Sequence, residues 1–72
     1  MLDTKKFGAY LAVKRKSMDM TQSDLAKKVN LTRQSISKYE TGESFPDISI
    51  IIQFADIFEI TIDELIKSGI PP

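Results

Sequence analysis

The sequence predicts an all-α protein built from five short helices. Apolar residues recur at three- and four-residue spacing over most of the chain, and this is the period of a helix with one buried face. Threonine, asparagine, aspartate and glycine interrupt the pattern at the positions expected for helix ends. No segment alternates with the two-residue period of a strand. We therefore expect one compact five-helix domain over residues 1–72.

A first helix is expected from about Thr4 to Lys16. Phe7, Leu11 and the aliphatic stem of Arg15 share one face of this helix, and Met18 continues the same stripe. This stripe predicts the side of the helix that packs into the protein.

A second helix is expected from Gln22 to about Val29. Asp19 can adopt the left-handed backbone conformation that ends the first helix. Thr21 is then the expected N-cap, with Asp24 in the place of the usual glutamate of a capping box. Asn30 follows as a helix stop.

A third helix, from Arg33 to Glu40, begins after the expected N-cap Thr32 and ends before Gly42. Only Ile36 and Tyr39 are apolar in this segment. The outer face and the N-terminal part of this helix carry side chains that can form hydrogen bonds, namely those of Arg33, Gln34, Ser35, Ser37 and Lys38.

Two more helices are expected in the C-terminal part of the chain. Asp47 caps a fourth helix, and Thr61 to Glu64 form another capping box before a short fifth helix that contains Leu65 and Ile66. Gly69 to Pro72 cannot continue it. The predicted core of the whole protein consists of Phe7, Leu11, Leu25, Ala26, Val29, Leu31, Ile36, Ile51, Phe54, Ala55, Phe58, Ile60 and Leu65.

The fourth helix contains more isoleucine than one buried face can hold. Ile48 and Ile51 can share the inward stripe, but Ile50, Ile52 and Ile57 cannot all join them. An exposed apolar patch can mark an association surface. Scattered surface isoleucine is the alternative.

The composition excludes several classes of function. The chain has no cysteine and no histidine, so a disulfide framework, a Cys/His zinc site, a thiol nucleophile and an imidazole base are all absent. We expect no enzyme, no metal site and no cofactor. The apolar runs, such as Ile50 to Ile52, are far too short to cross a bilayer, so we expect a soluble, cytoplasmic protein.

Charge is distributed unevenly along a chain of zero net charge. Residues 1–40 carry nine cationic and four anionic side chains, whereas residues 41–72 carry one and six. A cationic surface attracts phosphates. The sequence therefore predicts that the N-terminal half contacts a polyanion and that the acidic half faces away from it.

Four segments of the chain carry recognisable motifs. They are Met20 to Ala26 with the pattern T-Q-x-x-L-A, Leu31 to Gly42 with I-S-x-Y-E-x-G, Phe45 to Asp47, and Ala55 to Leu65. Together these segments resemble the lambda-repressor/Cro-like (Xre-type) helix-turn-helix family. The resemblance covers about residues 7–66, with the helix-turn-helix motif at 22–41. Two departures are Lys14, where relatives usually have an aliphatic residue, and a sequence pI of about 6.2.

The resemblance implies that the protein binds double-stranded DNA. In such a motif the second helix lies in the major groove and the first crosses the backbone. Arg33, Gln34 and Ser37 are then the expected base contacts, because Arg matches the guanine edge and Gln the adenine edge with two parallel hydrogen bonds. A solvated or phosphate-bound Arg33 is the alternative.

Other residues are expected to hold the DNA backbone or the motif itself. Phosphate contacts are expected from Gln22, Thr32, Ser35, Lys38 and Ser44. The family also uses the matching glutamine to buttress the reading helix. Arg15 and Glu40 match residues that form a structural ion pair beneath the motif in this family.

The function implied by the resemblance is that of a sequence-specific transcriptional regulator, a repressor. Relatives often dimerise through their C-terminal helices, so an inverted-repeat operator and a homodimer are expected. Alternatives are an antitoxin, a DNA-binding fragment of a longer regulator, and a protein-interaction module that has kept the fold. RNA binding would require exposed stacking aromatic residues, which the sequence does not suggest.

Overall fold

The predicted all-α architecture is confirmed. The computed structural model describes residues 3–68, and within this range it contains five helices and no strand. The helices are α1 (Thr4–Ser17), α2 (Gln22–Lys28), α3 (Arg33–Thr41), α4 (Ile48–Phe58) and α5 (Ile62–Lys67). The prediction that Gly69 to Pro72 cannot continue the last helix lies outside the described residues.

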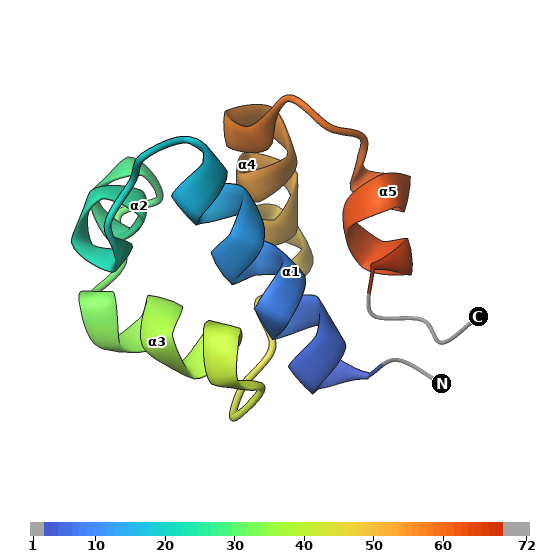
Figure 1. Cartoon of the computed structure of the whole chain (residues 1–72), viewed down its shortest axis with the longest axis horizontal. Helices are drawn as coiled ribbons and strands as arrows, with labels where there is room; N and C mark the ends of the chain where they lie inside the picture. The colour runs from blue at the N-terminus through green and yellow to red at the C-terminus, as the bar shows by residue number, and fades with distance from the viewer. Residues whose placement is uncertain (1–2, 69–72) are drawn as a thin grey trace.

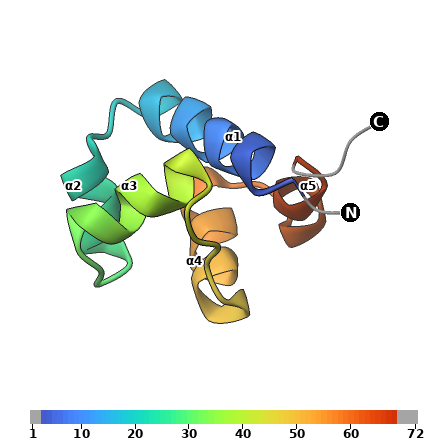
Figure 2. The same cartoon turned by 90° about the horizontal axis from the view of Figure 1, so that it is seen from below.

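α1 packs against α3, α3 also packs against α2, and α4 packs against α5. α2 and α3 lie on one side of α1, α5 lies on the opposite side, and α4 lies behind it (Figure 1). The view from below shows α3 and α2 together at one end of the molecule, with α5 at the other end (Figure 2). Among the described residues none of the helices is long and apolar enough to cross a lipid bilayer.

The helix starts agree with the sequence prediction at four positions. Thr21, Thr32, Asp47 and Thr61 each accept a hydrogen bond from the backbone N–H three residues later. Such caps satisfy backbone donors that have no partner within the helix. Asp3 caps α1 in a similar way, a cap that the sequence analysis did not identify.

The two capping boxes differ. In α2 the side chain of Asp24 also accepts from the backbone N–H of Thr21 at 2.9 Å, so that box is complete. In α5 only the Thr61 half of the predicted box is present, because the carboxylate of Glu64 lies 3.5 Å from the hydroxyl of Tyr10 instead. A tertiary contact with α1 has replaced the local one.

Four residues adopt the left-handed backbone conformation at helix ends. Asp19, Asn30 and Gly42 have φ values of 56°, 58° and 83°, as their predicted roles as stops require. Glu59, with φ of 56°, ends α4 in the same way. It was missed because glutamate is not a residue type that favours this conformation.

The core contains eleven of the thirteen residues predicted for it. The buried residues are Phe7, Leu11, Leu25, Ala26, Val29, Ile36, Ile51, Phe54, Ala55, Phe58 and Leu65. The other two, Leu31 and Ile60, are half-buried and pack against the edge of this cluster. They lie in connections between helices, where one side of the residue faces solvent.

Two apolar residues lie outside the stripe in which they were predicted. Met18 is 42% exposed because α1 ends at Ser17 and the chain turns away from the helix axis. Ile48, the first residue of α4, is 59% exposed and shares an outward edge with Ile52, which is 43% exposed. The inward stripe of α4 begins at Ile51 instead.

Gly8 allows α1 and α3 to approach closely. A Cβ built at Gly8 would overlap the backbone carbonyl oxygens of Tyr39 and Glu40. Glycine in a helix interior ordinarily costs stability. Its presence in α1 is explained by this contact with the backbone of α3.

A buried ion pair joins the same two helices. Arg15 Nε donates to Glu40 Oε2 at 2.7 Å, and a second guanidinium nitrogen donates to Glu40 Oε1 at 3.1 Å. The third nitrogen donates to the backbone carbonyl of Met20 at 2.8 Å. Only 10% and 7% of the two side-chain surfaces are exposed. The hydrogen bond with Glu40 raises the pKa of Arg15 above its usual value, although burial opposes this.

We expect Glu40→Ala to unfold the protein at a much lower temperature than wild type. Loss of one partner of a buried pair leaves the other charge uncompensated and costs about 3–5 kcal/mol. The double variant Arg15→Met/Glu40→Leu should recover much of this loss, because an apolar pair of similar volume can replace a buried ion pair. Thermal unfolding of wild type, Glu40→Ala and the double variant measures these differences in stability. A Glu40→Ala protein that melts like wild type yet binds its ligand weakly would contradict a structural role for the pair.

A second prediction concerns the close approach of α1 and α3. On helix propensity alone, Gly8→Ala would stabilise the protein by about 1 kcal/mol. Because the added methyl group overlaps two carbonyl oxygens of α3, we expect the substitution to destabilise it instead. Ala9→Gly, at an exposed position of the same helix, is the control for propensity. Equilibrium unfolding in urea shows whether the substitution raises or lowers the free energy of unfolding. A stabilised Gly8→Ala protein would rule out the close approach of α1 and α3.

Candidate nucleic-acid interface

The candidate interface is the exposed side of α3, held in place by α2. The two helices are joined by a turn in which Asn30 has a left-handed conformation and the N–H of Leu31 donates to the carbonyl of Ala26 at 2.9 Å. Val29 and Leu31 carry this turn against the core. The start of α3 is therefore fixed relative to α2.

The three predicted base-contacting residues lie together on this side. Arg33, Gln34 and Ser37 line one open hollow of about 310 Å³ with Lys38 and Glu43. Arg33, Gln34 and Lys38 are exposed and Ser37 is half-buried. Ser37 follows Gln34 by three residues and Arg33 by four, and these spacings place it on the same face of α3 as both.

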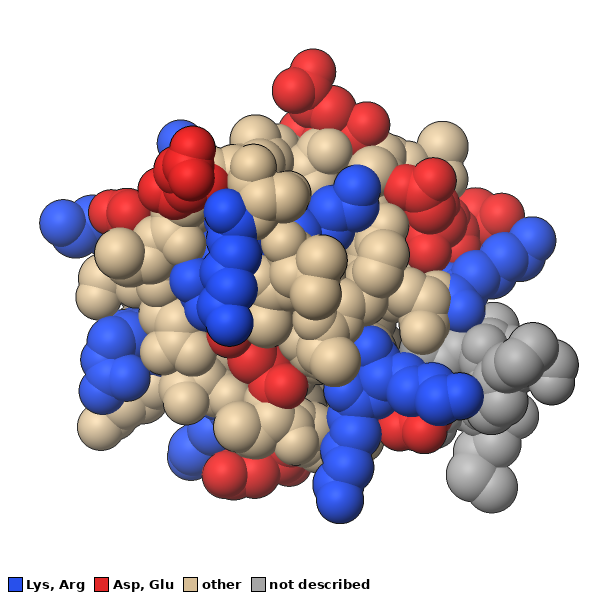
Figure 3. All heavy atoms as spheres, viewed as in Figure 1, with Lys and Arg blue, Asp and Glu red and all other residues tan. Residues whose placement is uncertain are grey.

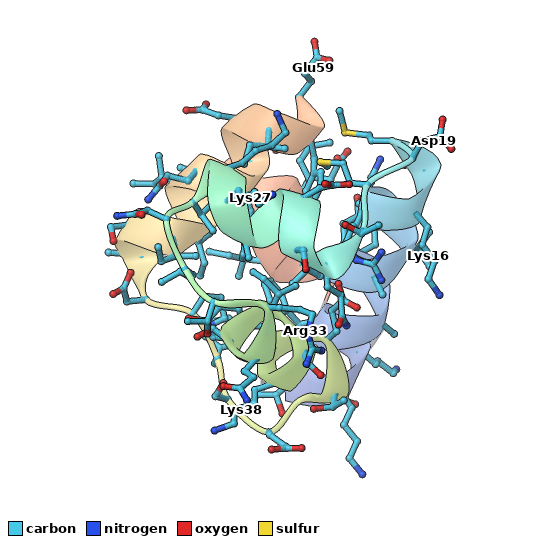
Figure 4. The ribbon with its side chains drawn as sticks, turned by 90° about the vertical axis from the view of Figure 1, so that its left-hand side faces the viewer. Lys16, Asp19, Lys27, Arg33, Lys38 and Glu59 are labelled. Carbon is cyan, nitrogen blue, oxygen red and sulfur yellow. The ribbon has the colours of Figure 1, made fainter. Side chains whose placement is uncertain are left out.

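Charged residues of both signs, Arg33, Lys38 and Glu43, line the hollow on α3. On the face seen in Figure 3 the cationic and anionic side chains are interspersed, so the cation excess of residues 1–40 does not form one uniform area there. Viewed from the side of α2 and α3, Arg33 and Lys38 project from α3 and Lys27 lies on α2 (Figure 4). Glu59 lies at the opposite end of this view from Lys38. Glu43 departs from the separation predicted from the sequence, because it belongs to the acidic half of the chain and yet lines the hollow on α3.

Gln22 connects the interface to the buried ion pair. Its Nε2 donates to Glu40 Oε1 at 3.1 Å, and its Oε1 accepts from a guanidinium nitrogen of Arg33 at 3.5 Å. Both ends of the amide are thus engaged within the protein. This is the buttressing arrangement that the sequence analysis gave beside the phosphate contact.

The hydroxyl groups at the start of α3 are tied to each other. Thr32 Oγ1 accepts from the backbone N–H of Ser35 at 3.2 Å and lies 3.1 Å from Ser35 Oγ. Thr32 is exposed, whereas Ser35 is half-buried. The hydroxyl of Thr32 therefore has a local structural task in addition to the expected phosphate contact.

The end of α3 is fixed by backbone hydrogen bonds. Lys38 O accepts from the N–H groups of Glu43 at 3.0 Å and Ser44 at 3.3 Å, around the left-handed Gly42. Ser44 is half-buried and follows the exposed Glu43. Thr4 Oγ1 also donates to the carbonyl of Gly42 at 3.2 Å. The turn after α3 is thus held at both its ends and from α1.

Tyr39 belongs to the core side of α3. It is half-buried, and its ring lies edge-on to Phe54 with 6.2 Å between ring centroids. Burial, with the charge of Asp47 as a second cause, raises the pKa of Tyr39. At the start of α2 the pKa shift has the opposite direction, because hydrogen bonds from Thr21 lower the pKa of Asp24.

Two observations at this site were not obtained from the sequence. The contact between Gln22 and Arg33 depends on the angle between α2 and α3, which no local pattern specifies. The sequence analysis also did not identify Glu43 as part of the site. Its position directly after Gly42, the glycine that ends a polar helix, is the signal that could have pointed to it.

Comparison with known proteins gives consistent matches. The model of a helix-turn-helix family matches residues 11–65. The phage CTXphi transcriptional repressor RstR of Vibrio cholerae is 40% identical over 55 residues, which are 76% of this chain and 49% of RstR. The chain thus spans about half the length of this curated relative.

Two solved structures are similar over nearly their whole length. The restriction-modification controller protein C.AhdI of Aeromonas hydrophila has a TM-score of 0.79 and 27% identity, covering 86% of this chain and 94% of that one. The P22 c2 repressor, solved in complex with a synthetic operator, has a TM-score of 0.82 and 25% identity, covering 90% and 98%. The chain belongs to the Cro/C1-type helix-turn-helix family, whose fold is that of the lambda-like repressors.

Proposed function

We propose that this chain binds double-stranded DNA in a sequence-specific manner as a helix-turn-helix transcriptional regulator, a repressor. The observation that carries the proposal is the cluster of Arg33, Gln34, Ser37 and Lys38 around one open hollow on α3. A helix of this kind fits the major groove and presents the residues of its N-terminal part to base edges. The names of the relatives support the same function.

In this proposal Arg33, Gln34 and Ser37 contact bases. Arg33 can make two parallel hydrogen bonds with guanine and Gln34 with adenine. The amide of Gln22 lies within 3.5 Å of the Arg33 guanidinium, and this contact supports a defined orientation of Arg33 before DNA arrives. A preorganised side chain loses less conformational freedom on binding.

Phosphate contacts are proposed for the residues around this cluster. They position the protein on the duplex and carry no sequence information. The backbone N–H groups at the start of α2, beside Gln22, have no partner within the helix and form the positive end of its dipole, which attracts a phosphate. The proposed phosphate contacts are Gln22, Thr32, Ser35, Lys38 and Ser44.

A homodimer is proposed as the binding unit. Ile48 and Ile52 are exposed four residues apart on α4, and an apolar edge of this kind supports an association surface. Two copies would place their α3 helices about 34 Å apart and require an inverted-repeat site. We further propose that the protein acts in the cytoplasm, that residues 1–72 form one domain, and that the chain has no enzymatic role.

Selection of bound sequences from a random duplex pool at physiological salt tests the proposal. We expect wild type to enrich an inverted repeat. Arg33→Ala should relax the preference at one base pair of each half-site, a loss of about 1–3 kcal/mol in discrimination. Lys16→Ala, which removes a cation from α1, is the control and should leave the selected sequence unchanged. Absence of any enrichment by wild type would favour a protein-interaction module instead.

A further inference from the structure

Glu43 lines the interface but has no role in the function proposed above. It directly follows Gly42, and its backbone N–H donates to the carbonyl of Lys38 at 3.0 Å. Glu43 is exposed and lines the hollow together with Arg33, Gln34, Ser37 and Lys38. The backbone hydrogen bond therefore holds an acidic residue at the end of α3, beside the surface that is proposed to enter the major groove.

This carboxylate changes the hydrogen-bonding character of the hollow. Arg33 and Lys38 can only donate, Gln34 and Ser37 can donate and accept, and ionised Glu43 can only accept. Among residues 3–68 the ion pairs are Arg15 with Glu40 and Lys67 with Asp63. Within this range Glu43 forms no ion pair with the cations that border the same hollow.

The chemistry of DNA limits what such a group can contact. Phosphate oxygens are anionic acceptors, so a carboxylate is repelled by them. The donors in the major groove are the amino groups of cytosine and adenine. On adenine the amino group stands beside the N7 acceptor, whereas cytosine presents its amino group without a neighbouring acceptor. A carboxylate is therefore best matched by cytosine.

We propose that Glu43 is a specificity-determining residue that accepts a hydrogen bond from the amino group of a cytosine in the major groove. This inference rests on the proposed DNA-binding function. At a site without that cytosine the carboxylate faces acceptors or phosphates and stays unpaired. Leaving a charged group unpaired in an interface costs more than its hydrogen bond contributes. Glu43 thus raises specificity chiefly by weakening binding to wrong sites.

The inference is tested by comparing Glu43→Gln with wild type in the same selection from a random duplex pool at one fixed salt concentration. Glutamine has the same shape, but its amide matches the donor and acceptor of adenine. We expect wild type to enrich cytosine at one position of each half-site. Glu43→Gln should lose that preference by about 5- to 100-fold, the range of one good base contact, and shift toward adenine. The positions that respond to Arg33→Ala should not change.

Glu59→Gln is the matched control, because it removes the same charge at the far end of the molecule from Lys38 (Figure 4). It should select the wild-type sequence. If Glu43→Gln selects the wild-type sequence at every position, whether its affinity rises or not, the base contact is overturned. If wild type itself enriches nothing, the proposed function fails. Thermal unfolding of each variant verifies that the proteins compared are folded.

Discussion

The ion pair between Arg15 and Glu40 is the interaction on which the geometry of the interface depends. Its atoms connect α1 to α3, and the same guanidinium holds the carbonyl of Met20 just before α2. Gln22 extends the network from Glu40 to Arg33 at the surface. Three helices are thus tied to one buried carboxylate. Because a buried charge without its partner is strongly unfavourable, alternative positions of α3 that break the pair are penalised.

Steric and backbone constraints act with the ion pair. Gly8 lets α1 lie directly against the carbonyl groups of Tyr39 and Glu40, close to the point where the pair forms. The left-handed Asn30 and Gly42 set the turns at the two ends of α3. A reading helix must be held in one register because each of its contacts matches one base edge. In the proposed function, these constraints fix the position of α3 within the protein before it contacts DNA.

Local patterns in the sequence predicted most of this architecture. The caps Thr21, Thr32 and Asp47 and the stop Asn30 depend on residues within a few positions of each other, and the structure has them where the sequence placed them. The exposed Ile48 is different. Whether a residue at the edge of an apolar stripe is covered depends on the neighbouring helices, and periodicity along one helix contains no information about them.

The candidate site could be predicted from the sequence only where it depends on local patterns, and not where it depends on contacts between helices. The face of α3 that carries Arg33, Gln34 and Ser37 follows from helical spacing alone, whereas the bond from Gln22 to Glu40 spans eighteen residues. In α5, outside the site, a long-range contact replaces a local one. The carboxylate of Glu64 lies at the hydroxyl of Tyr10 and not at the backbone N–H of Thr61, where the local pattern predicted it. The base contacts of Arg33, Gln34 and Ser37, the phosphate contacts and the dimer stay predictions.

Backbone amide chemical shifts, recorded while the protein is titrated with a duplex that carries the selected site, measure the position of α3 most directly. We expect the largest changes at residues 33–38 and 43–44 and at the start of α2, with the interior of α4 little affected. Shift changes confined to α4 and α5, with α3 unchanged, would contradict the entry of α3 into the major groove.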